Sequence, residues 1–199
     1  MERDTELALV ERLRRGDPDA FDDVYAVFNT RLFTFLARLS RRRDVAEDLL
    51  EETWLRLVKH ARRLQADTRL GPWLFTVARN LCVSYNRSRM LEDSAAAGLI
   101  ALWPFSLEHS SPFEAAAASE LERRIERALA SMPAVSREVL LLVCVAGLDH
   151  SDAADVCGIT PEALRQRLHR ARETLSKLLE HDAPAGTPAL GEMTSCPSR

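Results

Sequence analysis

Apolar residues recur at helical spacing along almost the whole chain of 199 residues, and no stretch alternates with a period of two for long enough to predict a strand. We therefore expect an all-α fold. The first long helix is expected to begin at the turn 16–19 and to end before the basic run 41–43. Its predicted buried stripe consists of Phe21, Val24, Tyr25, Phe28, Leu32, Phe33, Leu36 and Leu39.

Two more helices are expected in the first half of the chain. One begins at Asp44, with Glu47 three residues later as a capping-box partner. Its predicted core stripe consists of Leu50, Trp54, Leu57, Val58 and Ala61. The next begins at Pro72, because a proline in the first helical turn loses no hydrogen bond. Its inner residues are Trp73, Leu74, Val77, Ala78 and Leu81.

The pattern changes in the middle of the chain. From Met90 to about Ser119 it becomes rich in alanine, serine and proline, which is typical of a flexible linker. A helical stripe then resumes, breaks at Met132-Pro133, and continues as an apolar helix over 135–145. We expect a first domain over 1–90, a linker over 91–118, a second domain over 119–181 and a disordered tail over 182–199.

The run 147–172 has the signals of a helix-turn-helix. Ala154 is small where two helices must approach closely, and Gly158 supplies a left-handed turn. Ile159 fills the corner, Thr160 caps the second helix, and Pro161 occupies its first turn. These signals predict a second helix that enters the major groove of duplex DNA.

That second helix is amphipathic and basic. Leu164 and Leu168 are expected to be buried, and the polar face carries Arg165, Gln166, His169 and Arg170. Arginines also occupy positions 167 and 172. The formal net charge of -3 does not exclude nucleic acid, because clustering of charge matters more than the total.

Composition excludes several other classes. The cysteines Cys82, Cys144, Cys157 and Cys196 show no close paired spacing, so we expect neither a metal site nor a disulfide. The N-terminus is too polar for a signal peptide, and no apolar run could span a bilayer, which predicts a cytoplasmic protein without membrane insertion. No phosphate-binding loop or nucleophile–base pair is evident, so we expect no cofactor and no enzymatic activity.

Taken together, these features resemble the bacterial extracytoplasmic-function (ECF) sigma factors of the sigma-70 family. The motifs that carry the resemblance are Gly16-Asp17 with Ala20-Phe21, Ala46-Glu47-Asp48-Leu49 with Glu52-Thr53-Trp54-Leu55, residues 73–81, Met132-Pro133 with residues 137–142, and residues 167–172. The resemblance implies two helical domains, sigma region 2 and sigma region 4, joined by a flexible linker. It also implies a transcription initiation factor that joins core RNA polymerase and opens promoter DNA.

The resemblance suggests which residues bind each partner. For the minus-35 element these are Arg165, Gln166, Arg167, His169, Arg170 and Arg172. For the minus-10 element, where the connection 64–70 would capture a flipped base, they are Lys59, His60, Arg62, Arg63, Gln65, Asp67, Arg79, Asn80 and Arg87. For core polymerase they are Asp44, Asp48, Glu51 and Glu52, facing the clamp helices of the largest subunit. The flap of the second-largest subunit and an anti-sigma factor are further implied partners.

Some alternatives stay open at this stage. Acidic residues in a first helical turn also complement the helix dipole, without any partner. The linker is either a plain tether or a segment that Trp103 and Phe105 anchor within the polymerase. A helix-turn-helix regulator that binds duplex DNA as a dimer is the competing function. Departures from the family pattern are Glu51 and Val58, where glutamine and tryptophan are common, and the run 149–154 before the turn.

Overall fold

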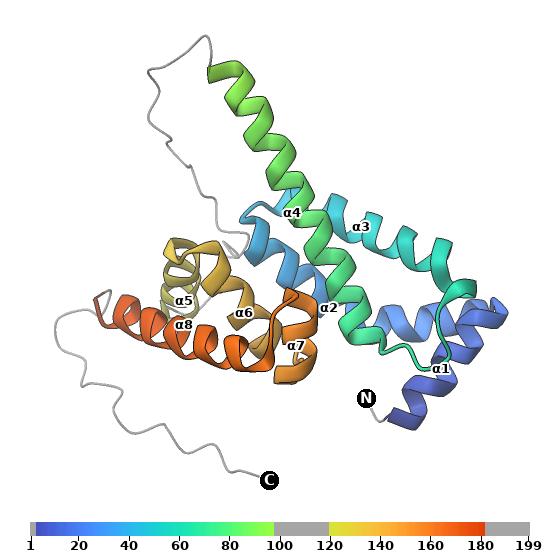
Figure 1. Cartoon of the computed structure of the whole chain (residues 1–199). Coiled ribbons are helices and arrows are strands. Elements are labelled where there is room, and N and C mark those ends of the chain that lie inside the picture. Colours follow the sequence, from blue (N-terminus) through green and yellow to red (C-terminus); the bar gives the residue numbers. More distant parts are fainter. Residues whose placement is uncertain (1–2, 98–119, 182–199) are drawn as a thin grey trace.

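The computed structural model describes residues 3–97 and 120–181, and both parts are helical (Figure 1). The first part contains α1 (Arg3–Arg15), α2 (Pro18–Ser40), α3 (Arg43–His60), the 3-10 turn η1 (Ala61–Arg63) and α4 (Leu70–Ala97). The second contains α5 (Glu120–Ser131), α6 (Ala134–Cys144), α7 (His150–Cys157) and α8 (Pro161–His181). No strand occurs within these two ranges, which confirms the all-α prediction.

The local signals of the helix-turn-helix act as predicted. Gly158 ends α7 in the left-handed conformation with φ 66°, which a residue with a Cβ rarely adopts. The backbone N–H of Ala163 donates to Thr160 Oγ1 at 3.2 Å, so Thr160 caps α8 and Pro161 is its first residue. Asp149 caps α7 by accepting from the backbone N–H of Asp152 at 2.8 Å.

The predicted capping box at Asp44 is wrong. Helix α3 begins one residue earlier, and its N-cap Arg42 makes no side-chain cap hydrogen bond. The guanidinium of Arg42 instead pairs with Asp44, and Arg43 pairs with Glu47 at 2.9 Å. Both carboxylates are therefore occupied by neighbouring arginines, which compete with the backbone for them.

Helix α4 also differs from the expectation at both ends. It begins at Leu70 rather than Pro72, and it continues to Ala97, into the range expected to be linker. Leucine and alanine in this stretch are good helix formers, which accounts for the extension. Trp103 and Phe105 lie outside the described residues, so the interpretation of the linker stays a prediction.

Three residues of the predicted core stripes are exposed: two lie in the first half, and the third is Leu121, 53% exposed, in the stripe of Leu121, Ile125 and Leu129 that resumes after the expected linker. Tyr25 is 42% exposed and Val58 is 59% exposed. Val58 directly follows the fully buried Leu57, and a step of one residue turns the side chain by about 100° around the helix. The buried face of α3 is instead formed by Val45, Ala46, Leu49, Thr53, Trp54 and Leu57.

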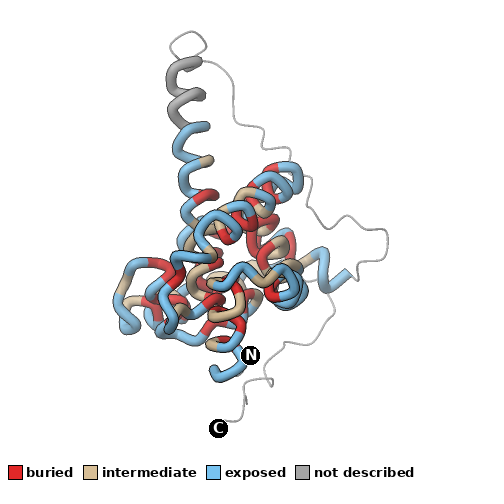
Figure 2. The backbone as a smooth tube through the Cα atoms, turned by 90° about the vertical axis from the view of Figure 1, so that its right-hand side faces the viewer, coloured by how far each residue is buried: buried red, intermediate tan, exposed pale blue. Residues whose placement is uncertain are grey.

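The two halves of the chain share one hydrophobic core. Helix α2 contacts α5 and α6, and α4 contacts α7. The buried residues form a continuous cluster that includes both halves, and Figure 2 shows them along the inner side of the helices. At the junction, Gly71 lies close to Leu148 of the second half and Phe28 of α2: a Cβ there would be 3.5 Å from each side chain, an ordinary van der Waals distance. The start of α4 therefore packs directly against Leu148.

Polar contacts tie the same two surfaces together. Arginines of the first half point into the second, where they meet carboxylates or a carbonyl oxygen. The pairs are Arg38 with Glu126 at 2.8 Å, Arg79 with Glu138 at 2.7 Å, Arg31 with the Ala146 carbonyl at 3.1 Å, and Arg69 with Asp152. In these four pairs the first half supplies the arginine, whereas the buried Arg137 of the second half points the other way and donates to the Arg38 carbonyl at 3.3 Å.

Candidate nucleic-acid and partner-binding surfaces

Helix α8 presents a polar face on the outer side of the second half. Leu164, Leu168 and Ala171 are buried against the core, as the amphipathic pattern predicts for the two leucines. Helices α5, α6 and α7 support this inner face, and Figure 1 shows α6 and α7 between α8 and the first half. The exposed residues are Arg165, Gln166, His169, Arg170 and Arg172, whereas Arg167 is half-buried. A single rigid helix therefore displays all the outward-facing residues of the predicted set together.

The residues of this face differ in how they are held. Arg165 pairs with Glu162 one turn earlier, and this contact lowers the pKa of the Glu162 carboxyl. His169 lies 3.6 Å from Glu173. Arg170 makes no ion pair with any of the side chains described in residues 3–89 and 120–181. It can therefore meet an anion without giving up a partner.

The connection between α3 and α4 forms the second surface. Leu64 and Leu70 are buried and anchor its two ends, whereas Gln65, Ala66 and Asp67 are exposed at its tip. A turn closes the tip, where the backbone N–H of Thr68 donates to the Gln65 carbonyl at 3.1 Å. The result is a short exposed loop held at both ends.

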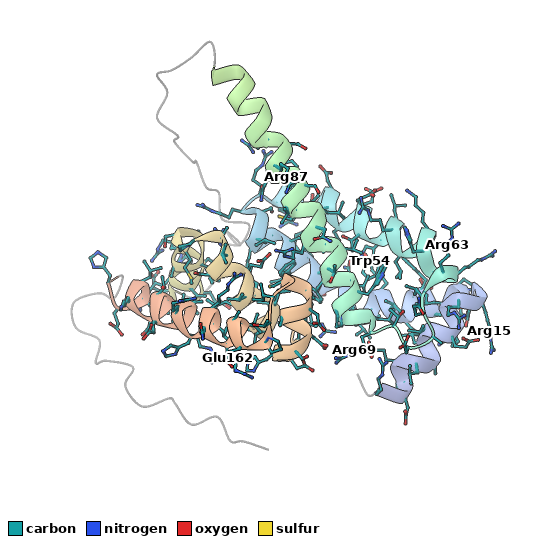
Figure 3. All side chains as sticks on the ribbon, viewed as in Figure 1. Arg15, Trp54, Arg63, Arg69, Arg87 and Glu162 are labelled. Carbon is teal, nitrogen blue, oxygen red and sulfur yellow. The ribbon has the colours of Figure 1, made fainter. Side chains whose placement is uncertain are left out.

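Basic residues of the predicted minus-10 set gather beside this loop. Lys59, His60, Arg62 and Arg63 are all exposed at the end of α3 and in η1. The His60 ring lies 6.4 Å from the ring of Trp73 at the start of α4. Figure 3 shows Arg63 at this end of the molecule.

Other members of that set lie elsewhere. Arg79 faces the junction between the halves, where Glu138 occupies it. Asn80 and Arg87 are exposed further along α4, and Figure 3 shows Arg87 well away from Arg63. The structure thus brings together the loop and the end of α3, but it does not bring Arg79 to them.

Sequence reasoning missed two residues at this surface, Arg3 and Glu6 of α1. Arg3 Nη2 donates to the Asp67 carbonyl at 2.7 Å, and the backbone N–H of Leu70 donates to Glu6 Oε1 at 2.8 Å. Both contacts span 64 residues of chain. No local pattern could have indicated them, because they depend on how α1 packs against η1 and α2.

An acidic face covers one side of α3. Asp44, Asp48 and Glu51 are exposed, and Glu52 is half-buried and paired with Arg56 at 2.9 Å. The hydrogen bond from the Arg42 guanidinium lowers the pKa of the Asp44 carboxyl. Helix α3 packs on α2 and α4. The acidic face therefore lies at the surface while the opposite face holds the core, and a partner would compete with Arg42 and Arg56 for Asp44 and Glu52.

The remaining chemistry of the described residues is sparse. Among the side chains described in residues 3–89 and 120–181, no group of three or more from histidine, cysteine, aspartate and glutamate could hold a metal ion. Burial raises the pKa of the Cys82 and Cys157 thiols to about 11 each. Within the same ranges, no helix has the length and apolar character that crossing a membrane requires.

Comparison with known proteins identifies the family. Residues 24–92 match Sigma-70 region 2, and residues 122–175 match Sigma-70, region 4. The RNA polymerase sigma factor CarQ of Myxococcus xanthus is 34% identical over 172 residues, which cover 85% of this chain and 95% of that protein. The ECF RNA polymerase sigma factor EcfG of Rhodopseudomonas palustris is 37% identical over 161 residues, covering 81% and 85%. The chain belongs to the ECF RNA polymerase sigma factors.

Solved structures show the same architecture. The sigma factor RpoE from Bartonella quintana, solved with the anti-sigma factor NepR, superposes with a TM-score of 0.66 at 28% identity. The match covers 82% of this chain and 98% of that one. CnrH, solved with the cytosolic domain of CnrY, shares the fold with a TM-score of 0.67 at 22% identity, covering 89% and 99%.

Family membership confirms the function expected from the sequence. A sigma factor is a transcription initiation factor and not an enzyme, and it acts on promoter DNA with core RNA polymerase. The competing interpretation, a dimeric regulator independent of polymerase, loses its basis because region 2 accompanies the helix-turn-helix. In this sigma factor α1 precedes the residues that match region 2.

Proposed function

We propose that this ECF sigma factor reads the two promoter elements with separate surfaces, α8 for the minus-35 element and the loop between α3 and α4 for the minus-10 element. The observation that carries this proposal is the polar face of α8, which is basic, exposed and supported from behind by the rest of the second half. An α-helix of this kind fits the major groove of B-DNA. The assignment of residues 1–90, 91–118, 119–181 and 182–199 to region 2, linker, region 4 and tail belongs to the same proposal.

The side chains of α8 divide into two roles. Arg165 and Arg170 donate to guanine edges, and Gln166 reads adenine, because arginine and glutamine match the acceptor and donor patterns of those bases. His169 lies on the same face. Arg167 and Arg172 bind phosphates, which position the helix without reading sequence. Affinity for the minus-35 element should therefore fall steeply as salt rises, because each phosphate contact releases counterions.

At the minus-10 element the loop 64–70 captures one base of the melted strand. Flipping a base out of the stack costs a few kcal/mol. Contacts of the protein to the edge of the base and to the DNA backbone offset this cost. Gln65 and Asp67 supply polar groups at the exposed tip. The basic residues at the end of α3 follow the backbone, and Asn80 and Arg87 extend this path along α4. Arg79 joins them only when it leaves Glu138.

Helix α3 docks on core polymerase through its acidic face. Asp44, Asp48, Glu51 and Glu52 complement a basic partner, and the clamp helices of the largest subunit are that partner in this proposal. The flap of the second-largest subunit binds the second half. An anti-sigma factor controls the protein by covering these surfaces, an inference supported by the structure of the similar Bartonella quintana sigma factor with NepR.

In vitro transcription with core polymerase over a fragmented genome tests the proposal. Start sites above the core-only background are expected, and their upstream sequences define the two elements. Arg165→Ala and Arg170→Ala should then reduce selectivity for the minus-35 element and leave binding to core polymerase unchanged.

Arg123→Ala is a matched control for Arg165→Ala. Arg123 lies on α5 in the same half, is equally exposed at 57%, and pairs with Glu120 at the same three-residue spacing. It should leave promoter choice unchanged. Loss of holoenzyme assembly in both α8 variants would reject the division of roles between the halves.

A further inference from the structure

Helix α1 holds the backbone of the minus-10 loop through two side chains. Glu6 accepts the Leu70 N–H at 2.8 Å, and Arg3 donates to the Asp67 carbonyl at 2.7 Å. The two side chains also pair with each other, Arg3 Nη1 lying 2.9 Å from Glu6 Oε2. One connected unit on α1 therefore holds both the tip of the loop and its C-terminal end.

The first backbone N–H groups of α4 need a hydrogen-bond acceptor from elsewhere, because the residue before the helix has no side-chain acceptor. The Arg69 carbonyl accepts the first intrahelical hydrogen bond, from the Trp73 N–H at 3.0 Å, which makes Arg69 the N-cap residue. An arginine side chain has no acceptor and cannot cap a helix. Leu70 is fully buried, so its N–H has no access to water. Glu6 supplies the missing acceptor, and its negative charge also suits a helix N-terminus.

Burial makes the contact rigid. Glu6 is only 9% exposed, and the next turns of α1 insert Leu9, Val10 and Leu13 into the core. At the far end of α1, Gly16 packs against the Arg62 side chain, with Nη2 3.4 Å from the position of an added Cβ. Helix α1 thus contacts the segment 61–70 near both of its own ends.

We infer that Glu6 and Arg3 are positioning residues for base recognition: α1 fixes the loop 64–70 in the conformation that discriminates the flipped base. The inference rests on the proposed role of that loop. Capture of a base requires polar groups placed to within a fraction of an ångström. A loop that has lost its hydrogen bonds at Leu70 and Asp67 therefore discriminates less between the matched base and the other bases. The hydrogen bonds of Glu6 and Arg3 go to each other and to the loop, and not to α8 or the acidic face of α3, so binding to the minus-35 element and to polymerase should not depend on them.

The experiment uses holoenzyme assembled from core polymerase and the full chain. Transcription start mapping with the wild-type protein first defines the minus-10 sequence. Affinity is then measured for fork-junction DNA in which the non-template minus-10 strand is single, either matched or substituted at one base. The readout is the ratio of the two affinities at each position.

The variants separate positioning from general stability. Glu6→Ala should lower the ratio at the captured base by about fivefold, the effect of losing one helix cap. Glu6→Gln should retain most of the ratio, because its amide oxygen still accepts from Leu70. Arg3→Ala, at an exposed site, should give a smaller loss. Glu11→Ala is the matched control, since Glu11 is a half-buried glutamate of α1 that pairs with Arg14 and Arg15 of its own helix.

The outcomes distinguish this inference from the proposed function. A wild-type holoenzyme with no base preference in the minus-10 strand would reject the role of the loop itself. A preference that survives in both Glu6→Ala and Arg3→Ala would overturn the role of α1 alone. Equal weakening of all substrates and of core binding, with an unchanged ratio, would also overturn it, because that result reports general destabilisation. If Glu6→Ala does not fold, Arg3→Ala decides the question: a lower ratio supports the role of α1, and an unchanged ratio overturns it.

Discussion

The ion pair between Arg79 and Glu138 offers a direct test of how the two halves are held together. Arg79 Nε lies 2.7 Å from Glu138 Oε1, across the junction of α4 and α6. The Glu138 side chain is 10% exposed and that of Arg79 is 24% exposed. The other carboxylate oxygen of Glu138 faces the Cys157 thiol at 4.0 Å, a weak donor at long range.

These exposures predict unequal effects of the two single substitutions. Arg79→Ala leaves a nearly buried carboxylate without its partner, which costs about 3 to 5 kcal/mol in pairs of this kind. Glu138→Gln leaves a guanidinium that still reaches water, so the loss should be about 1 kcal/mol. The apolar double variant Arg79→Met with Glu138→Leu should recover most of the stability, because replacing both charges removes the desolvation penalty.

Equilibrium unfolding in urea, followed by far-ultraviolet circular dichroism, measures these free energies. Small-angle X-ray scattering reports in parallel whether the halves separate, because undocking raises the radius of gyration. Arg43→Ala is the control, because it breaks an ion pair at the surface: the Arg43 side chain is 64% exposed and that of its partner Glu47 is 55% exposed. It should change neither the free energy of unfolding nor the radius of gyration. The reasoning fails if Arg79→Ala is as mild as this control, or if Glu138→Gln destabilises as much as Arg79→Ala.

Further predictions concern thiols, backbone conformation and pH. In a Cys196→Ser variant, a thiol reagent should label the exposed Cys144 of the native protein rapidly. It should label Cys82 and Cys157 slowly, because burial raises the pKa of both thiols and keeps them protonated. Mass spectrometry of the labelled peptides checks this. Gly158→Ala should lower the free energy of unfolding by about 1 kcal/mol, because alanine is strained at φ 66°, and a variant as stable as wild type in urea would contradict this. Burial raises the pKa of Asp152, so the folded protein binds that proton more tightly than the unfolded chain. The contribution of Asp152 to stability should therefore fall as pH rises above about 4, and Asp152→Asn should remove this fall in urea titrations at a series of pH values.

The helix-turn-helix was predictable because its signals are local. Gly158, Thr160 and Pro161 each act within one turn of their own position, and the structure has each in the predicted role. Amphipathic spacing likewise predicted that Leu164 and Leu168 face inwards. The prediction of a capping box at Asp44 was wrong because two local interactions compete there. Arg42 pairs with Asp44 and Arg43 pairs with Glu47, so these carboxylates do not cap the helix.

The predicted sites differ in the same way. The α8 set lies on one helix, and helical geometry alone places its outward-facing residues together. The minus-10 set draws on several elements, and there the sequence could not indicate that Arg79 faces Glu138 rather than the loop. Nor could it indicate Arg3 and Glu6, since their contacts depend on the packing of α1.

By itself, the sequence determined the helical class, the helix-turn-helix with its basic outer face, and the family. Those properties follow from periodicity and from interactions within a few residues, which survive any rearrangement of the helices. Only the tertiary structure decided that the halves share a core, which arginines cross the junction, and that Glu6 caps a helix 64 residues away. Such contacts form between surfaces whose relative position no local pattern encodes, because burial and desolvation are properties of the packed molecule.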